Sequence, residues 1–267
     1  MPALLPWVAT LVGGVGIGRL LRLRRDAHRA RQLAARAVAY ERLLGDAGAA
    51  LLVVGDSLSV GVGASTPEHS VAGRIAAACP GLTVVNRARS GARLADVPDQ
   101  VRAAPRRRWS AVLLTIGGND ALRRTPPSRL REDARRAIAA VSAIAPHGVV
   151  ATSANLAVVP IVPWPLTAVL ERRSRRVRDA IAASCERLVT HGERGTTHFV
   201  DFFRPRTVDP FGRRPERYFG PDRVHPSSHC YGVCFRMIER RTGLAATLRW
   251  GLHAAHGRCA APGGPGR

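Results

Sequence analysis

The sequence predicts an α/β fold in which a parallel sheet lies between layers of helices. Five short apolar segments, often β-branched, alternate with segments whose apolar residues recur at helical spacing. Several of the short segments are nearly continuous hydrophobic runs, as is typical of strands buried on both faces of a sheet. Strands and helices that alternate in this way form parallel sheets with helices packed against them.

The predicted strands and helices follow one another in a regular order. The strands are centred on Leu51, Val84, Leu114, Val150 and Val200. The helices are predicted over residues 71–78, 94–103, 128–144 and 165–190, with a last helix after Pro226. Proline suits the first turn of a helix, which places the start of the last one. Ligands of such folds bind outside the carboxyl ends of the strands, so reactive residues are expected there.

Length and composition bound the domain organisation and the class of partner. The 267 residues suit one sizeable domain, which we expect over residues 50–243. The net charge is +22 and all 41 basic residues are arginine, a bias that a GC-rich coding background explains more simply than a binding code. Aromatic residues make up 5% of the chain and do not interleave with the basic ones, so no specific nucleic-acid interface is predicted.

The first 24 residues are predicted to be a single membrane anchor. Residues 4–18, LLPWVATLVGGVGIG, are apolar, and Arg19 and Arg22 after them can snorkel toward the headgroups. A cleaved signal peptide carries its charge before the apolar run, whereas here the charge follows it. The positive-inside rule then places the main body of the protein in the cytoplasm. A buried N-terminal helix and an exported protein are the alternatives.

Two further segments flank the predicted domain. Residues 25–49 are predicted to be a basic amphipathic helical connector, because apolar residues recur there at helical spacing among many arginines. Residues 244–267 are predicted to be a C-terminal tail whose end, AAPGGPGR, is too rich in glycine and proline to pack.

The cysteines do not indicate a disulfide framework, because their number is odd and their spacing is wide. They are Cys79, Cys185, Cys230, Cys234 and Cys259. His225 and His229, which precede two of them closely, can share a helix face and bind a metal. No second group of ligands stands at a recognisable spacing, so core packing is the preferred interpretation and no metal or cofactor is predicted.

The segment LLVVGDSLSV, residues 51–60, raises the first question of chemistry. Ser57 comes just after the first predicted strand, where this kind of fold presents residues to a ligand. Taken alone, Gly-Asp-Ser before a helix is a turn and a helix cap. The segment is not a G-x-S-x-G nucleophile elbow, because position 59 is serine.

Three other segments place polar groups or flexible backbone near strand ends. Gly91 follows the second strand, and Asn119 in TIGGND follows the third and can offer its amide to an anionic oxygen. Asp222 precedes His225 by three residues, so its carboxylate can bond one ring nitrogen while the other takes a proton from a serine. Each also has a purely structural interpretation: a turn at Gly91, a helix cap at Asn119 and the start of a helix after His225.

Taken together, these motifs resemble the four blocks of the SGNH hydrolases of GDSL type. GDSL at residues 55–58 matches the first block, Gly91 the second, GGND at 117–120 the third and DRVH at 222–225 the last. The motif GDSL alone is weakly specific, whereas four blocks in this order are strongly specific. The resemblance covers roughly residues 51–242. It implies a flavodoxin-like, three-layer α/β/α sandwich with a five-stranded parallel sheet, and metal-free hydrolysis of esters or thioesters.

The resemblance also implies a role for each matching residue. Ser57 is expected to be the nucleophile, His225 the general base and then the general acid, and Asp222 the residue that orients the imidazole. The oxyanion hole is expected from the backbone N–H groups of Ser57 and Gly91 and the side-chain amide of Asn119. Asp56 is expected to be a structural hydrogen-bonding residue.

The motifs do not specify the acyl group. Residues 155–166, NLAVVPIVPWPL, follow the fourth strand, and Val159, Ile161 and Trp164 suit an apolar acyl chain, with packing onto the body or the membrane as the equal alternative. We therefore expect an esterase for small or lipid-derived acyl esters or thioesters. A carbohydrate O-deacetylase and a catalytically silent protein that binds lipid or a partner at the membrane are the alternatives.

Overall fold

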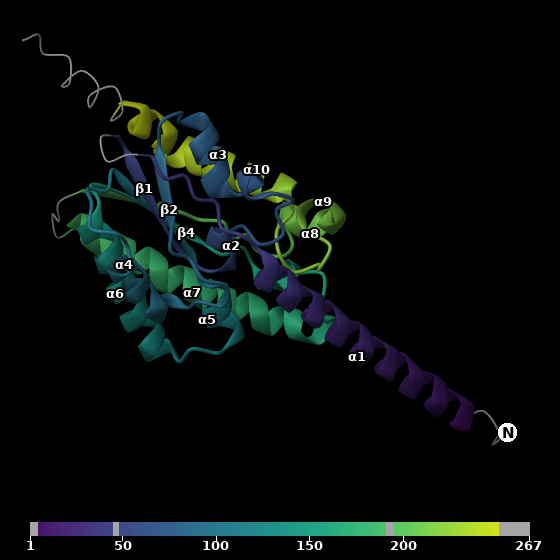
Figure 1. Cartoon of the computed structure of the whole chain (residues 1–267). Coiled ribbons are helices and arrows are strands. Elements are labelled where there is room, and N and C mark those ends of the chain that lie inside the picture. Colours follow the sequence, from purple (N-terminus) through teal and green to yellow (C-terminus); the bar gives the residue numbers. More distant parts are fainter. Residues whose placement is uncertain (1–4, 45–47, 191–194, 251–267) are drawn as a thin grey trace, which may run out of the picture.

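The computed structural model describes residues 5–44, 48–190 and 195–250 (Figure 1). Its centre is one five-stranded sheet in the order β2-β1-β3-β4-β5, and every neighbouring pair is parallel. The strands are β1 (Ala50–Gly55), β2 (Thr83–Asn86), β3 (Ala111–Ile116), β4 (His147–Thr152) and β5 (Thr196–Val200). The predicted parallel sheet and its five strands are confirmed.

The helices of the described residues include those that the sequence predicted. They are α1 (Leu5–Arg36), α2 (Ser57–Val60), α3 (Val71–Ala78), α4 (Val97–Arg102), α5 (Gly118–Leu122), α6 (Pro127–Ile144), α7 (Trp164–Thr190), α8 (Pro210–Arg213), α9 (Pro215–Tyr218) and α10 (Ser228–Thr242). The predicted helices correspond to α3, α4, α6, α7 and α10. The short helices α2, α5, α8 and α9 span too few residues to show a helical repeat in the sequence.

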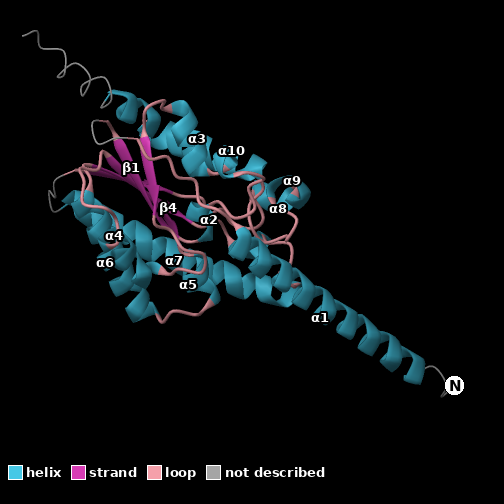
Figure 2. Cartoon of the chain, viewed as in Figure 1, coloured by secondary structure: helices cyan, strands magenta, loops and turns pink. Residues whose placement is uncertain are grey.

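The helices cover the sheet on both faces, which gives three layers (Figures 1 and 2). Alternate residues of a strand point to opposite faces. Leu51 and Val53 of β1 therefore pack in a core with residues of α3 and α10. Leu52 and Val54 pack in a second core with residues of α4, α6 and α7. Because the central strands are buried on both faces, they read as continuous hydrophobic runs.

The predicted membrane anchor over residues 1–24 is not supported. Within the described residues, none of the helices is both long enough and apolar enough to cross a bilayer. In α1 the apolar stretch ends at Gly18, about 21 Å along the helix from Leu5, and Arg19 follows. A bilayer core is about 30 Å thick, so this stretch is too short to span it.

The predicted connector is only partly helical. Helix α1 continues through the predicted boundary at residue 24 and ends at Arg36. Beyond it, Arg42 pairs with Val84 beside β2 through two backbone hydrogen bonds of 2.8 and 2.9 Å. The guanidinium of Arg42 donates to three backbone carbonyls, at Ala76, Cys79 and Leu82. The chain after α1 is thus attached to the sheet edge.

The C-terminal boundary predicted at residue 243 lies inside the packed structure. Residues 244–250 are helical. Leu244, Ala245 and Leu248 are buried in the core on the α3 and α10 side. The core therefore continues into the predicted tail, whose glycine- and proline-rich end lies outside the described residues.

Candidate active site

Strand β1 ends in a tight turn that only glycine permits. Gly55 has a φ of +130°, and a Cβ atom there would collide with the carbonyl oxygen of Thr115. The buried side chain of Gln100 holds this glycine at both polar groups: its Oε1 accepts from Gly55 N at 2.6 Å, and its Nε2 donates to Gly55 O at 2.9 Å. The turn places Ser57 as the first residue of α2, above the end of the sheet.

The residues on either side of Ser57 are fixed by hydrogen bonds. Asp56 caps α2, because its Oδ1 accepts from Leu58 N at 2.9 Å. The hydroxyl of Ser59 lies 2.7 Å from the carbonyl oxygen of Val54 and 2.5 Å from Oγ1 of Thr115. These bonds hold the turn on which Ser57 stands, and Ser57 lines the cavity described below.

Asp56 is itself a strongly perturbed group. Burial raises its pKa from 3.8 to about 7, against the opposing effects of the Leu58 N–H and of His225. This value suits the structural role that the sequence predicted for Asp56, since a carboxyl buried beneath α2 favours its neutral form.

The loop after α9 carries Asp222 and His225 in a bonded pair. Nδ1 of His225 lies 2.6 Å from Oδ2 of Asp222, while Oδ1 accepts from the backbone N–H groups of Val224 and His225 at 3.0 Å each. Burial would raise the pKa of Asp222, but these hydrogen bonds outweigh it and hold the pKa below 3.8. An ionised Asp222 accepts from Nδ1–H, which leaves Nε2 of His225 as an acceptor.

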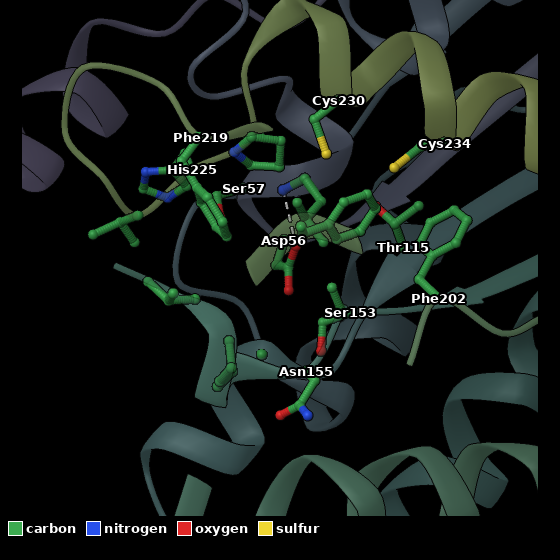
Figure 3. Close-up of a pocket in the computed structure, with 18 of the residues that line it drawn as sticks. Asp56, Ser57, Thr115, Ser153, Asn155, Phe202, Phe219, His225, Cys230 and Cys234 are labelled. Carbon is green, nitrogen blue, oxygen red and sulfur yellow. Dashed lines mark hydrogen bonds between the residues drawn. The ribbon is translucent and has the colours of Figure 1, made fainter. Parts of the chain in front are cut away.

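Contacts between α10 and the loop after α2 bring this pair to Ser57. Gly63 has a φ of +92°, and a Cβ atom there would collide with the carbonyl oxygen of Pro226. The Tyr231 hydroxyl donates to the carbonyl oxygen of Val62 at 2.8 Å. As a result Ser57 and His225 line the same cavity (Figure 3).

The three expected oxyanion donors lie on neighbouring segments. Asn119, at the start of α5, lines the same cavity, and its Nδ2 donates to the carbonyl oxygen of Ala92 at 3.0 Å, which leaves its second N–H unused in this bond. Gly91 directly precedes Ala92 in the chain and has a φ of +83°. Within the described part of the chain, neither Ser57 N–H nor Gly91 N–H donates to a protein acceptor. Gly91 does not line the cavity itself.

The cavity beside Ser57 has a volume of about 140 Å³ and mostly apolar walls. Of the three residues predicted to bind the acyl chain, Val159 lines it, while Ile161 and Trp164 do not. The side chain of Trp164 is 81% exposed at the start of α7, and its contact with an acyl chain stays a prediction. The apolar walls come from elsewhere: they include Phe202, Phe211, Phe219, Cys230, Tyr231 and Cys234.

The cysteines and the two histidines that were considered as metal ligands lie in different surroundings in the structure. Cys79, Cys185, Cys230 and Cys234 are buried and free, as core packing predicted, and Cys259 lies outside the described residues. His229 does not share a site with His225, because its Nε2 accepts from Nε of Arg217 at 2.9 Å. Among the described residues, no three His, Cys, Asp or Glu side chains are grouped as metal ligands.

Gln100 and Ser59 are the supporting residues that sequence reasoning missed. Gln100 stands in the helix predicted over 94–103, where a glutamine normally faces water, and only the three-dimensional contact with Gly55 reveals its role. Ser59 was noted only because it breaks the nucleophile-elbow pattern. Its hydrogen bonds to β3 give that departure a structural reason.

Comparison with known proteins indicates the family and agrees with the fold. The sequence matches the family model of the GDSL-like lipase/acylhydrolases over residues 53–233. A salicylyl-acyltransferase, SsfX3, from a tetracycline biosynthetic pathway has a TM-score of 0.57 and 18% identity; the match covers 76% of this chain and 56% of that one. A member of the lipolytic G-D-S-L family from Veillonella parvula has a TM-score of 0.53 and 16% identity, and the match covers 73% of this chain and 96% of that one. TesA has a TM-score of 0.52 and 20% identity, and the match covers 72% of this chain and 97% of that one. No curated protein matches significantly.

Proposed function

Because the chain belongs to the GDSL-like lipase/acylhydrolase family, we propose that it hydrolyses carboxylic acyl esters or thioesters through an acyl-enzyme on Ser57. The observation that carries this proposal is the 2.6 Å bond between Asp222 and Nδ1 of His225, in a loop that lines one cavity with Ser57. The substrates are small or lipid-derived acyl esters, since the cavity walls are largely apolar.

In the first half of the reaction, Oγ of Ser57 attacks the acyl carbonyl carbon. Nε2 of His225 takes the hydroxyl proton, and the ionised Asp222 stabilises the imidazolium that forms. Collapse of the tetrahedral intermediate breaks the bond to the leaving group, which receives the proton from His225 and departs as an alcohol or thiol.

The negative charge of the tetrahedral intermediate needs donors that are already in place. Ser57 N–H and Gly91 N–H are without protein acceptors in the described residues, and Asn119 has an amide proton to spare. The bond from Asn119 to Ala92 O holds the amide next to the segment that carries Gly91, which supports the proposal that these groups form the oxyanion hole.

In the second half, a water molecule attacks the acyl-enzyme carbonyl. His225 takes a proton from this water and then returns it to Oγ of Ser57, which releases the carboxylic acid and restores the free enzyme. In each half His225 first accepts a proton and then donates it, and both halves depend on the orientation that Asp222 gives to the imidazole.

The proposal is tested with the full-length purified protein and its Ser57→Ala variant on p-nitrophenyl esters from acetyl to palmitoyl. We expect the variant to lose at least a thousandfold in kcat while circular dichroism stays unchanged. If the folded wild-type protein hydrolyses no ester or thioester faster than the variant, the enzymatic proposal fails, and a binding function becomes the better explanation.

A further inference from the structure

The cavity beside Ser57 extends behind the nucleophile into the body of the protein. Its inner walls come from α3, from the segment after β5, from α8 and from α10. The apolar side chains on these walls are each less than 10% exposed: Val71, Phe202, Phe211, Cys230, Tyr231 and Cys234. We call this inner part the chamber. Its position allows a group attached to Ser57 to extend away from solvent.

The polar groups of the chamber are engaged with the protein's own backbone. The Tyr231 hydroxyl bonds to Val62, and Asp56 accepts from Leu58. Both polar atoms of the Asn155 amide are used, one by Ala157 N–H and the other by the Arg204 carbonyl. Ser153 also lines the cavity, and its hydroxyl is an exception among these groups. Most of the surface that a ligand meets is nevertheless carbon and sulfur, which favours an apolar occupant over a sugar.

The size of the cavity limits this occupant. The whole cavity, the chamber together with its mouth at Ser57, has a volume of about 140 Å³, which must hold the carbonyl group as well as the acyl chain. An apolar cavity of about 150 Å³ in a protein core admits a benzene molecule, that is, six carbons. A hexanoyl group fills such a space, whereas a palmitoyl chain must leave most of its length outside it.

Two thiols from successive turns of α10 form one wall of the chamber (Figure 3). Cys230 and Cys234 are four residues apart and lie on the same helix face, with their sulfur atoms turned toward the cavity. Helix α10 starts three residues after His225, so Cys234 lies about 6 Å further along the helix axis from the triad than Cys230 does. Cys234 is therefore placed toward the deep end of the chamber.

We propose that the chamber is the acyl-binding site for acyl groups of about six carbons, and that Cys234 sets the upper limit on acyl length. This inference rests on the proposed acyl-enzyme at Ser57. It identifies the substrate class as short-chain acyl esters and makes the thiol face of α10 a specificity determinant.

The acyl-length profile of the wild-type protein is the first test. For p-nitrophenyl esters we expect kcat/KM to rise about fourfold for each methylene that enters the chamber, or about 250-fold over the four methylenes from acetyl to hexanoyl. From octanoyl onward it should fall, because the chamber is full. A profile that keeps rising through palmitoyl overturns the proposal without any variant.

The second test changes the deep end alone. Cys234→Leu fills space for about two methylenes, so the ratio of hexanoyl to acetyl kcat/KM should fall about tenfold and the optimum should shift to butyryl. Val233→Leu on the same helix is the matched control, because Val233 does not line the cavity, and it should leave the ratio unchanged. Cys234→Val provides a smaller filling change if the leucine variant does not fold.

The outcomes separate this inference from the proposed function. Hydrolysis that requires Ser57 but shows the same length profile in wild type and Cys234→Leu contradicts the chamber and leaves the esterase intact. Hydrolysis that survives Ser57→Ala contradicts the proposed function itself. A shift in the optimum with Cys234→Leu, absent from Val233→Leu, supports the chamber.

Discussion

At the scale of single residues, the site depends on how burial and hydrogen bonding set the charge of each carboxyl group. Asp222 is kept ionised by three hydrogen bonds, whereas burial raises the pKa of Asp56 to about 7. The two acids belong to the same proposed active site, yet between about pH 4 and pH 7 Asp222 is ionised while Asp56 favours its neutral form. The first can stabilise an imidazolium, and the second supports the turn that presents Ser57.

Replacement of Asp222 by asparagine tests the first role. The amide oxygen stays with the backbone N–H groups of Val224 and His225, so the NH₂ group faces Nδ1 and donates to it. His225 is then held in the wrong tautomer, and kcat should fall by about 10⁴-fold with little change in KM. Asp201→Asn is the control, because this carboxylate pairs with Arg178 away from the cavity. A drop of less than tenfold for Asp222→Asn, with the fold intact, contradicts the triad.

Replacement of Asp56 by asparagine tests the second role through stability. The folded protein retains a proton on Asp56 that the unfolded chain releases above about pH 4. Its unfolding free energy therefore falls with rising pH from about 4 to about 7, by at most about 1.4 kcal/mol per unit from this group, and no further above that. Asparagine does not titrate in this range. The difference in unfolding free energy by which the variant is less stable than the wild type should therefore shrink as the pH rises from about 4 to about 7. Urea unfolding at pH 4.5, 5.5 and 6.5 measures it, and a deficit independent of pH contradicts the assignment.

At the scale of elements, the site is assembled where strand ends are held to neighbouring loops. Gln100 of α4 supports the end of β1, and Asp120 of α5 accepts from Leu94 N–H at 3.0 Å. These bonds join the segments that carry Ser57, Gly91 and Asn119. The catalytic geometry thus depends on side chains that never reach the cavity surface.

Gln100→Ala should weaken the site without touching the substrate. The change leaves the buried Gly55 N–H without its partner, and such a loss costs about 1–3 kcal/mol of unfolding free energy. Because the turn before Ser57 loosens, we expect kcat to fall more than KM rises. Thermal unfolding and steady-state kinetics together check this, and unchanged kcat in a destabilised variant would show that Gln100 serves the fold alone.

Helix α1 also contacts the loop that carries Asp222 and His225. Asp26, which is buried, lies 3.6 Å from the Arg223 guanidinium, and Arg223 stands between Asp222 and His225 with a φ of +59°. The same side chain donates to the carbonyl oxygen of Pro160 at 3.4 Å. We expect a coupling of about 0.5–1 kcal/mol between Asp26→Ala and Arg223→Ala in a double-mutant cycle of unfolding free energy. Additive effects would show that the two side chains do not interact.

At the scale of the whole molecule, the sequence predicted the sheet well because its signal is local. Strands such as Ala111–Ile116 are continuous apolar runs, and α3 was predicted at the residues where it occurs. Of the residues in the four motif blocks, Ser57, Asn119 and His225 line one cavity, whereas Gly91 does not. Sequence patterns record these features because each is written in a few adjacent residues.

The features that the sequence did not predict depend on contacts between distant segments. The walls of the chamber come from four elements, and no spacing links Val71, Phe202 and Cys234. The opposite error concerns the N-terminus, where apolar composition suggested a membrane anchor, but none of the helices in the described residues is long and apolar enough to span a bilayer. Composition reports what a segment can bury but not where it lies.

Covalent trapping of Ser57 tests the central claim most directly. The full-length protein is treated with p-nitrophenyl butylphosphonate, and intact-mass and peptide mapping locate the phosphonyl group. The account predicts one adduct, on Ser57, formed at least 100-fold more slowly in His225→Ala because the hydroxyl then lacks its general base. An adduct on another residue, or labelling of Ser57 at an equal rate without His225, would contradict it.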